Sequence, residues 1–471
     1  MKELLDILHS QNFTGLCDDS RRVQKGNVFF SFPVENAERF ALDAMNSGAI
    51  AIVGEGNPPQ GTEEIFIRVD SVSKARVESA QEVYDRPFEK LKVHAVTGTN
   101  GKTTTAFLMR EILVAAGKKV ALLGTICNKI NDTVWESSLT TPGLLDLYAF
   151  ASAALQEGVT DLVMEASSHA LHQGRMDGVR FASALFSNLT QDHLDYHKTM
   201  ENYFLAKKRL FDCYLAEDGL PIINIDDSYG ALIAKEHYPR QILVSRKVSA
   251  NADVHPSEEP VLNENGIHIL VPKISSEAFE SPLCGNFNVE NILLILAWAF
   301  ALGISESVVR KALALIKVPG RFEKVYGENG KHIVVDYAHT PDALQRVLET
   351  ARSLCRGKLS VVFGCGGDRD ALKRPMMGAV AEKIADKVWV TSDNPRTENP
   401  KEIMDDIIAG MEGKFLLEEN RALAILAAVS SMEEGDWLVV AGKGHENYQI
   451  IGTEKKHFSD VEEVLKAVKV C

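Results

Sequence analysis

A glycine-rich turn between an apolar strand and a helix constrains this chain more than any other feature. The turn, Gly98-Thr99-Asn100-Gly101-Lys102-Thr103-Thr104, comes just after the apolar run Val93-His94-Ala95-Val96. Glycines in such a turn allow successive backbone N–H groups to converge on an anion, and the N-terminus of the following helix adds partial positive charge. We therefore expect Lys102 to reach the outer phosphates of a nucleotide and the Thr103 hydroxyl to bind Mg²⁺.

The segment after this turn has the periodicity of a helix. Apolar residues recur there at helical spacing, at Phe107, Leu108, Ile112 and Leu113. Gly117 stands where a C-capping glycine is expected. The turn has two residues, Thr99 and Asn100, between its first glycine and Gly-Lys, whereas the common phosphate loop has about four. A plain hairpin is the alternative, but the order strand, turn, helix favours a nucleotide loop of a particular subtype.

Length and charge limit the classes of partner. At 471 residues the chain has room for about three domains. Its net charge of −14 argues against nucleic acid or an anionic membrane surface as the main partner, and it leaves open an anionic substrate at a local basic site. The seven cysteines are scattered, and no two are spaced as a metal-binding pair, which is typical of a reduced cytosolic protein.

No segment reads as a targeting or membrane sequence. The N-terminus, Met1–Asp6, carries acids and no long apolar core, so we expect no signal peptide. The longest apolar run, Ile292–Leu302, is too short to span a bilayer and predicts a buried helix. We therefore expect a cytoplasmic protein without membrane insertion.

Strands alternate with helices along the chain, which predicts an α/β fold with mostly parallel sheets covered on both faces. Residues 1–88 lack a nucleotide loop and form a small module, with strands at 26–32 and 49–53 and a helix between them. Further strands are predicted over 93–96, 162–164, 184–186, 221–224, 333–336, 359–363, 388–390 and 437–440. Because ligands bind beyond the carboxyl ends of parallel strands, polar residues that follow these strands are candidate site residues.

Two polar segments follow strands near the phosphate loop. Glu165 closes an apolar strand, at a place suited to a Mg²⁺ ligand because Mg²⁺ prefers hard oxygen ligands and phosphate. The alternative is an acid that suits the dipole at a helix N-terminus. The segment Asn188–His197 holds two histidines and two aspartates directly after a strand. Its alternative is a solvated loop with capping residues.

Lys207 lies in an amphipathic helix over 203–211, where composition predicts a surface lysine. Nothing in the residues alone separates it from Lys208.

Two turns follow strands in the last third of the chain. Gly364-Cys365-Gly366-Gly367 suggests a dinucleotide loop, but Arg369 stands where the third glycine is needed. In Asp393-Asn394-Pro395-Arg396, Pro395 stiffens the turn and Arg396 offers a planar fork suited to a carboxylate. An ordinary turn before a helix is the alternative for this second motif.

Several motifs together resemble the Mur ligase family, the ATP-dependent amide-forming enzymes of peptidoglycan precursor assembly. They lie at 97–104, 188–197, 319–321 and 336–341. The motifs at 364–370, 393–396 and 442–446 are similar to those of the members that add diaminopimelate. The resemblance covers the whole chain.

The resemblance implies three domains: a UDP-binding domain over 1–88, a central P-loop ATP-binding domain over 89–321 and a C-terminal Rossmann-like, amino-acid-binding domain over 322–471. It implies ATP and Mg²⁺ as cofactors and UDP-MurNAc-L-Ala-D-Glu and meso-diaminopimelate as substrates, joined through an acyl phosphate. We expect a monomer.

The resemblance also assigns residues by role. Those implied in catalysis are Lys102, Glu165, His193 and Lys207, the last as a carbamate. Those implied in metal binding are Thr103, Glu165, His193 and Lys207. ATP is assigned to the phosphate loop with Asn288, Arg321 and Asp336. The UDP-muramoyl-dipeptide is assigned to Ser20, Thr140, Thr141, Ser167, Gln173 and Arg175. Diaminopimelate is assigned to Arg369, Asp393, Asn394, Pro395, Arg396, Gly442 and Glu446.

The first domain departs from the family pattern, and other functions stay open. Gly26-Asn27 stands where Gly-Asp is usual, and 34–38 lacks the glycines common in the nucleotide-sugar loop. Alternatives are the L-lysine-adding ligase of the family, folylpolyglutamate synthase, and a P-loop protein that hydrolyses ATP to switch conformation. The substrate of folylpolyglutamate synthase lacks UDP and has no need of a separate domain over 1–88, which argues against that enzyme.

Overall fold

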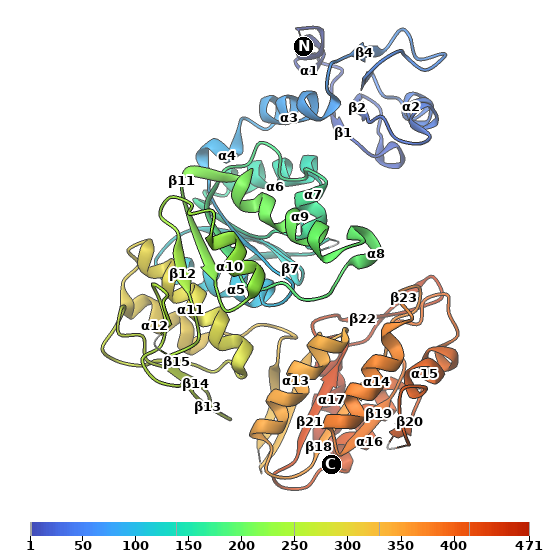
Figure 1. The fold of residues 1–471 in the computed structure, drawn as a ribbon. Helices are drawn as coiled ribbons and strands as arrows, with labels where there is room; N and C mark the ends of the chain where they lie inside the picture. The colour runs from blue at the N-terminus through green and yellow to red at the C-terminus, as the bar shows by residue number, and fades with distance from the viewer. Residues whose placement is uncertain (1, 138, 249, 329, 414, 471) are drawn as a thin grey trace. The chain divides into compact units, whose positions relative to one another are not determined.

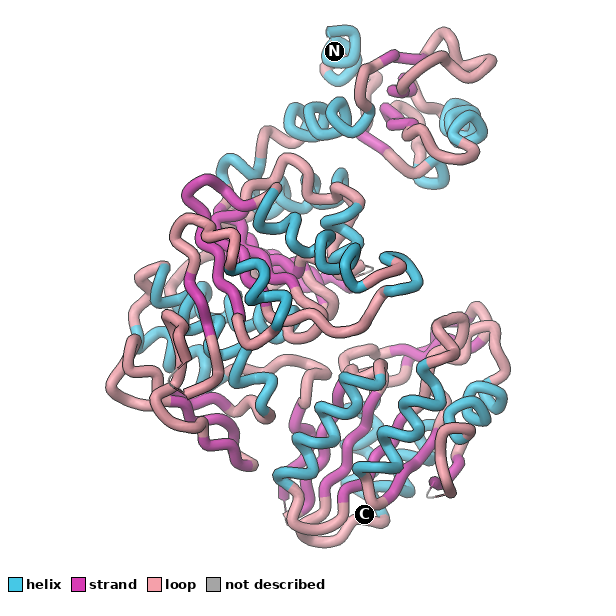
Figure 2. Tube along the Cα trace, in the orientation of Figure 1, coloured by secondary structure: helices cyan, strands magenta, loops and turns pink. Residues whose placement is uncertain are grey.

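The computed structural model describes residues 2–470 except 138, 249, 329 and 414. The chain divides into two compact units. The first comprises residues 1–97, 117–184 and 193–221, and the second comprises 98–116, 185–192 and 222–471. Figures 1 and 2 show helices and strands alternating along most of the chain. The domain boundaries expected from the sequence, at 88/89 and 321/322, stay predictions.

The N-terminal segment forms a small α/β layer in the first unit. Its four parallel strands, in the order β1-β2-β3-β4, are Gly15–Cys17, Asn27–Ser31, Ala51–Gly54 and Phe66–Arg68. Its main helices are α1 (Lys2–Leu8), α2 (Ala37–Asn46) and α3 (Val72–Val83). The two predicted strands with a helix between them are confirmed as β2, α2 and β3. Phe29 and Ile52 pack on Ala41 and Ala44 in its core.

An eight-stranded sheet, in the order β12-β11-β10-β5-β9-β6-β7-β8, follows. Its strands in chain order are β5 (Lys92–Thr97), β6 (Val120–Leu123), β7 (Cys127–Ile130), β8 (Thr133–Glu136), β9 (Asp161–Glu165), β10 (Phe181–Phe186), β11 (Leu215–Asn224) and β12 (Ile242–Val244). β9 pairs in parallel with β5 and β6, and all its residues are buried, which is why it reads as a continuous apolar run. The predicted strands of this region are confirmed.

The helices of this region include those that carry the candidate site residues. They are α4 (Pro87–Lys90), α5 (Lys102–Ala115), α6 (Leu144–Gln156), α7 (Ser168–His172), α8 (Leu194–His197), α9 (Met200–Asp212), α10 (Ser228–Ala234), α11 (Asn286–Ala301) and α12 (Glu306–Leu315). The strands β13 (Val261–Asn263), β14 (Gly266–Ile269) and β15 (Phe279–Ser281) form a small antiparallel sheet. The apolar run that predicted a buried helix lies mainly in α11, where Trp298 is fully buried. Among the described residues, no helix combines the length and the apolar character needed to cross a membrane.

The C-terminal segment of the second unit is a six-stranded α/β layer with the strand order β16-β17-β21-β18-β19-β20. Its strands are β16 (Glu323–Glu328), β17 (Lys331–Asp336), β18 (Leu359–Phe363), β19 (Lys387–Val390), β20 (Phe415–Leu417) and β21 (Trp437–Ala441). Its helices are α13 (Pro341–Leu354), α14 (Lys373–Ile384), α15 (Pro400–Ile408), α16 (Arg421–Ser430) and α17 (Asp460–Val470). Successive residues of β17 alternate between two cores: Val334 packs with α13–α15, and Val335 packs with α16 and α17. Helices therefore cover both faces, as predicted.

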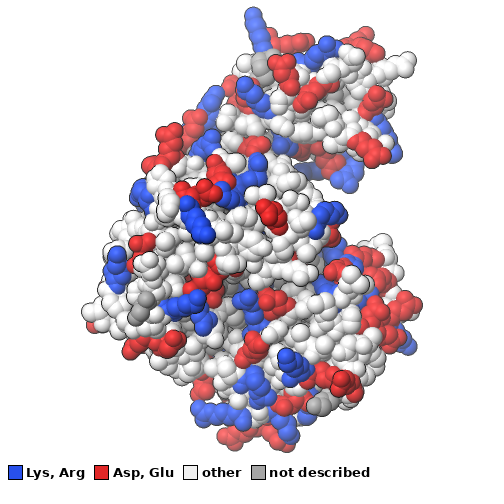
Figure 3. Space-filling view, in the orientation of Figure 1, with Lys and Arg blue, Asp and Glu red and all other residues white. Residues whose placement is uncertain are grey.

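Charged side chains are interspersed on the face drawn in Figure 3. Lysine and arginine alternate there with aspartate and glutamate over short stretches of surface. This face therefore presents charges of both signs close together.

A buried ion pair joins the two helices on one face of the C-terminal sheet. Arg421 and Asp460 are both fully buried, their two N–O distances are 2.7 Å, and Arg421 also donates to the carbonyl of Ala441 (2.9 Å). Removing one partner of such a pair leaves an uncompensated buried charge.

Asp460→Asn is therefore expected to lower the free energy of unfolding by about 3–5 kcal/mol. Denaturant unfolding measures this change. The control is Glu454→Gln, because the Glu454–Lys456 pair is mostly exposed and should contribute less than about 1 kcal/mol. Equal effects of the two variants would contradict the structural importance of the buried pair.

Candidate active site

The predicted phosphate loop joins β5 to α5, and Lys102 is the first residue of the helix. Gly98 and Gly101 have φ angles of 153° and 85°, which other residues rarely adopt. A Cβ atom would collide with Ser187 at the first position and with Asn291 at the second. Both glycines are therefore required by the close approach of neighbouring side chains.

The loop is held in shape by the residues that follow β10. The backbone N–H of Thr99 donates to the carbonyl of Asn188 (2.8 Å), and the backbone N–H of Asn100 donates to the side-chain Oδ1 of Asn188 (2.9 Å). The Ser187 hydroxyl donates to the carbonyl of Asn100 (2.6 Å). Asn188, the first residue of the segment 188–197, thus orders the phosphate loop. This end of the segment is therefore bonded to the protein and is not a solvated loop.

Two cationic side chains lie on the phosphate loop. Lys102 Nζ donates to the carbonyls of Gly98 (2.9 Å) and Thr99 (2.8 Å), so its ammonium is folded back over the turn. Arg321 donates through Nη2 to the Thr103 hydroxyl (3.1 Å), and its guanidinium lies 4.7 Å from the centre of the Tyr337 ring. The structure therefore brings Arg321 to the turn as well as Lys102.

The other two residues assigned to ATP make contacts within the protein. Asp336 accepts from the backbone N–H groups of Phe322 (2.6 Å) and Ala338 (2.7 Å), and burial raises the pKa of its carboxyl group. Asn288 donates to the carbonyl of Cys284 (2.7 Å) and accepts from Asn291 (3.0 Å). Asp336 thus fixes the backbone at Phe322 and Ala338, and Asn288 links Cys284 to Asn291 at the start of α11.

Glu165 is a buried carboxylate at the end of β9 in the first unit. Its oxygens accept from the backbone N–H (2.7 Å) and the hydroxyl (3.0 Å) of Thr125. Gly124 leaves room for it, because a Cβ there would come within 2.6 Å of Glu165 Oε1. The hydroxyl of Ser167 caps α7, the helix that follows β9.

The side chains assigned to the UDP-muramoyl-dipeptide form a connected group beside Glu165. The hydroxyls of Thr125 and Thr140 lie 3.1 Å apart, and Thr141 donates to the carbonyl of Glu165 (2.7 Å). The backbone N–H of Ser167 donates to the Thr141 hydroxyl (3.1 Å).

Arginine and glutamine extend this group. Arg175 donates to the carbonyl of Thr141 (3.0 Å) and, through two nitrogens, to Gln173 Oε1 (2.9 and 2.6 Å). Gln173 in turn donates to the Tyr196 hydroxyl (3.0 Å). Within the described part of the chain, no hydrogen bond joins Ser20 to this group. Ser20 begins a short 3₁₀ turn whose last residue, Arg22, pairs with Asp146 on α6.

His193 is exposed and lies at the edge of a cluster of rings in the first unit. The ring centres of His193 and His169 lie 4.9 Å apart, and those of His169 and Tyr196 lie 4.2 Å apart. His197 is buried, and its Nε2 lies 3.0 Å from the Ser168 hydroxyl. Burial, with the neighbouring histidines and Lys207, lowers the pKa of His197 to about 4. His197 is therefore neutral at pH 7.

Lys207 is buried, and the expectation of a surface lysine is wrong. Its exposed fraction is 1%, and its Nζ lies 4.7 Å from the centre of the Tyr203 ring. Lys208 instead forms an ion pair with Asp212 (2.8 Å) along the helix. Helical spacing gives no signal for this difference: Lys207 lies four residues after Tyr203 and three before Leu210, and Lys208 has the same spacing to Phe204 and Phe211, which are also buried.

The described side chains do not form a complete metal site by themselves. No three histidine, cysteine, aspartate or glutamate residues among them converge as a metal-binding group.

In the C-terminal segment, four polar residues converge beyond the carboxyl ends of β19 and β21. Asn394 donates to Glu446 (2.9 Å). Lys443 Nζ donates to Asn394 Oδ1 (3.1 Å) and to Glu446 (3.3 Å), and it lies 3.7 Å from Asp393 Oδ1. Lys443 lies in the motif at 442–446, and no role for it was predicted from the sequence.

The remaining residues assigned to diaminopimelate lie around this group. Arg396 donates through Nη1 to the carbonyl of Gly367 (2.8 Å) and has a φ of 51°. A Cβ at Gly442 would come within 2.6 Å of Asp393 Oδ2, so glycine lets that carboxylate approach. Arg369 is exposed, and its described contact is with the carbonyl of Asp368 (3.3 Å). Pro395 lies between Asn394 and Arg396 in the same turn.

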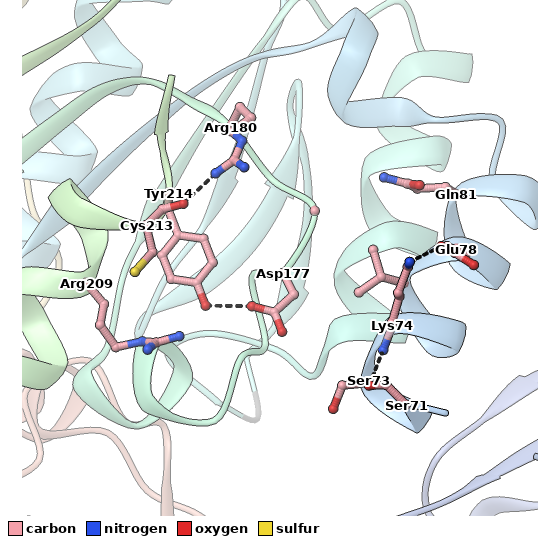
Figure 4. Close-up of a pocket in the computed structure, with 12 residues that line it drawn as sticks. Ser71, Ser73, Lys74, Glu78, Gln81, Asp177, Arg180, Arg209, Cys213 and Tyr214 are labelled. Atoms are coloured by element: carbon pink, nitrogen blue, oxygen red, sulfur yellow. Dashed lines mark hydrogen bonds and ion pairs between the residues drawn. The ribbon is translucent and has the colours of Figure 1, made fainter. Parts of the chain in front are cut away.

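A separate pocket of about 530 Å³ lies in the first unit and is lined by residues of α3 and by residues near Tyr214. In Figure 4 the Tyr214 hydroxyl points to Asp177, to which it donates (2.7 Å). None of the predicted site residues lines this pocket.

Comparisons with known proteins identify the family. The Mur ligase middle domain matches residues 96–299, and the Mur ligase glutamate ligase domain matches residues 320–444. Proteins named UDP-N-acetylmuramoyl-L-alanyl-D-glutamate–2,6-diaminopimelate ligase from Synechococcus elongatus and Thermosynechococcus vestitus are 42% and 43% identical to the chain. The alignments cover 97% and 98% of this chain and 94% of each relative.

A solved structure of an enzyme with the same name is 35% identical, with a TM-score of 0.68, and the match covers 97% of this chain and 95% of that one. This match confirms the predicted fold class, an α/β protein of N-terminal, central and C-terminal domains. On these matches over nearly the whole sequence, the chain belongs to the Mur ligase family.

Proposed function

We propose that the protein is an ATP-dependent ligase that joins meso-diaminopimelate to UDP-N-acetylmuramoyl-L-alanyl-D-glutamate in peptidoglycan precursor synthesis. The names of relatives at about 40% identity over nearly the whole chain support this activity. The observation that carries the choice of amino acid is the turn at 393–396, where Arg396 stands beside Asp393 and Asn394. Cytoplasmic location and a monomeric state remain predictions.

The reaction proceeds in two steps. The γ-carboxylate of D-glutamate attacks the terminal phosphorus of ATP, which gives an acyl phosphate and ADP. The amine of diaminopimelate then attacks the acyl carbon, phosphate leaves, and the nitrogen loses a proton as the amide forms. Such chemistry depends on positioning and charge neutralisation more than on a protein nucleophile.

The phosphate loop and Arg321 are assigned to ATP. Their backbone N–H groups, the Lys102 ammonium and the Arg321 guanidinium would neutralise the phosphates. Asn288 and Asp336 are assigned to ATP with them, by the family resemblance.

The residues fit Mg²⁺ as a second cofactor. Mg²⁺ usually keeps waters and substrate phosphates among its ligands, so it needs few protein oxygens. Following the family resemblance we assign Thr103, which has a hydroxyl oxygen, and Glu165, a buried carboxylate oriented by Thr125, to Mg²⁺. When bound, the ion would neutralise charge on the transferred phosphoryl group.

Lys207 and His193 are assigned to a second Mg²⁺. Burial disfavours the charged ammonium of Lys207, and its neutral amine can add CO₂ with loss of a proton to form a carbamate. The carbamate supplies the carboxylate oxygens that an unmodified lysine lacks. The group of Thr140, Thr141, Ser167, Gln173 and Arg175 is assigned to the dipeptide, and Ser20 to the uridine.

Phosphate release tests the reaction class. It should require both the UDP-dipeptide and an amino acid. Release without an amino acid would favour an ATP-driven switch, and release with a folate in place of the UDP-dipeptide would favour a folylpolyglutamate-synthase-like enzyme.

Arg396→Ala is expected to raise the KM for meso-diaminopimelate steeply, because the far carboxylate of this substrate loses its guanidinium partner. Truncating one side of a desolvated ion pair costs about 2–5 kcal/mol, or roughly 30-fold to several-thousand-fold in affinity. Steady-state kinetics with each substrate varied in turn measures the change.

The KM values for ATP and the UDP-dipeptide should hardly change in this variant. Arg356→Ala is the control, because Arg356 is largely exposed and its nearest acid, Glu264, is 3.9 Å away. An unchanged KM for diaminopimelate in Arg396→Ala would exclude the assigned contact.

A further inference from the structure

Lys443 is the most deeply buried cation of the group at 393–396 and 442–446. It follows β21 directly after Gly442, and its side chain has an exposed fraction of 0%. Its ammonium lies between two carboxylates, 3.3 Å from Glu446 and 3.7 Å from Asp393. A buried ammonium is stable only when such partners compensate it, so Lys443 and these acids form one electrostatic unit.

Lys443 also fixes the orientation of Asn394. The Oδ1 atom of Asn394 accepts from Lys443 Nζ (3.1 Å) and from the backbone N–H of Ile450 (3.0 Å). The amide nitrogen must then face Glu446, to which it donates (2.9 Å). The nearby buried cation Arg421 is neutralised by its own partner, Asp460, and adds no net charge to the group.

We propose that Lys443 sets the net charge of the amino-acid pocket and thereby makes it selective for a zwitterionic terminus over a purely cationic one. The inference rests on the proposed function, in which this group binds the far end of the amino-acid substrate. Asp393 and Glu446 alone would favour any ammonium. The two acids are balanced by the cations Lys443 and Arg396, since Arg369 is exposed to solvent, and a ligand end with one ammonium and one carboxylate matches that balance.

The far ends of the two candidate amino acids differ in this respect. Meso-diaminopimelate ends in an ammonium and a carboxylate, whereas L-lysine ends in an ammonium alone. Without Lys443 the pocket would carry an excess negative charge, which attracts the lysine ammonium and repels the diaminopimelate carboxylate. Lys443 is thus a specificity-determining residue that acts through Asp393, Asn394 and Glu446.

The test is kcat/KM for meso-diaminopimelate and for L-lysine with Lys443→Met, which removes the charge and keeps a similar length. The ratio of the two values should fall by about tenfold or more toward L-lysine. Lys443→Arg keeps the charge and should keep the ratio within about threefold even if both values fall. Tyr448→Phe is the control: it removes a hydroxyl 3.4 Å from Glu446 without changing the charge, and the ratio should stay the same.

An unchanged ratio in Lys443→Met, with both values lowered equally, would overturn the inference and leave a structural role. A fall of the same ratio toward L-lysine in Lys443→Arg would also overturn the inference, because this variant keeps the charge. The arginine variant therefore tests the inference even if the methionine variant fails to fold. A native protein that prefers L-lysine would refute the proposed substrate only. In that case the Lys443 inference is tested by whether the ratio in Lys443→Met moves further toward L-lysine than in the native protein.

Discussion

Lys102→Ala is expected to reduce the rate of ligation by roughly 10³-fold, because a charge that stabilises the transferred phosphoryl group is lost. In the structure the Lys102 ammonium lies over the loop carbonyls of Gly98 and Thr99, within the turn that Asn188 orders. Formation of the UDP-tripeptide, followed by chromatography, measures the effect.

Binding of the UDP-dipeptide to this variant should be nearly unchanged, because that ligand is assigned to other residues; calorimetry can measure it. Lys118→Ala is the matched control, since Lys118 is an exposed lysine just beyond the same helix. Full ATP turnover in Lys102→Ala would refute the assignment of the loop.

Lys207→Ala is expected to be nearly inactive, with a loss comparable to that in Lys102→Ala, and to regain part of its activity when formate or acetate is added. The physical reason is that a small carboxylate can enter the space left by the side chain and replace the oxygens of the proposed carbamate. Initial rates over a range of added carboxylate concentrations measure the rescue.

Lys208→Ala provides the comparison on the same helix. Lys208 pairs with Asp212 along the surface of α9, and its removal should leave the rate nearly normal. Similar losses in the two variants would contradict the special role of Lys207. An unmodified Lys207 in a high-resolution structure with Mg²⁺ and substrate bound would contradict the carbamate.

The strands that position the site could be predicted because they are buried and parallel. β9, β18 and β21 are buried along their whole length and are mostly apolar, and polar residues stand at or just beyond the end of each. The antiparallel strands β7 and β8 were not predicted. They pair through the backbone at the edge of a sheet and carry mixed side chains, so they have no clear periodicity.

The site residues divide in a similar way. Local motifs identified the phosphate loop and the turn at 393–396, because their chemistry lies within a few consecutive residues. Thr125 could not be found, because its two bonds to Glu165 join residues that are 40 positions apart. Lys443 lies in the motif at 442–446, but what distinguishes it is burial between Asp393 and Glu446, which a single sequence does not report.

Lys207 is an intermediate case. The helix was predicted, but Lys208 has the same spacing to Phe204 and Phe211 as Lys207 has to Tyr203 and Leu210, so periodicity favours neither lysine. A buried lysine is uncommon without a functional or compensating partner. What distinguishes Lys207 from Lys208 is its burial beside Tyr203, and only the structure reports this.

The most direct test of the proposed function compares kcat/KM for meso-diaminopimelate and L-lysine on the unmodified protein, with ATP and UDP-N-acetylmuramoyl-L-alanyl-D-glutamate saturating. We predict ligation that depends on both ATP and the UDP-dipeptide, with a strong preference for meso-diaminopimelate. A preference for L-lysine, or the absence of a ligated product while ATP is consumed, would contradict it.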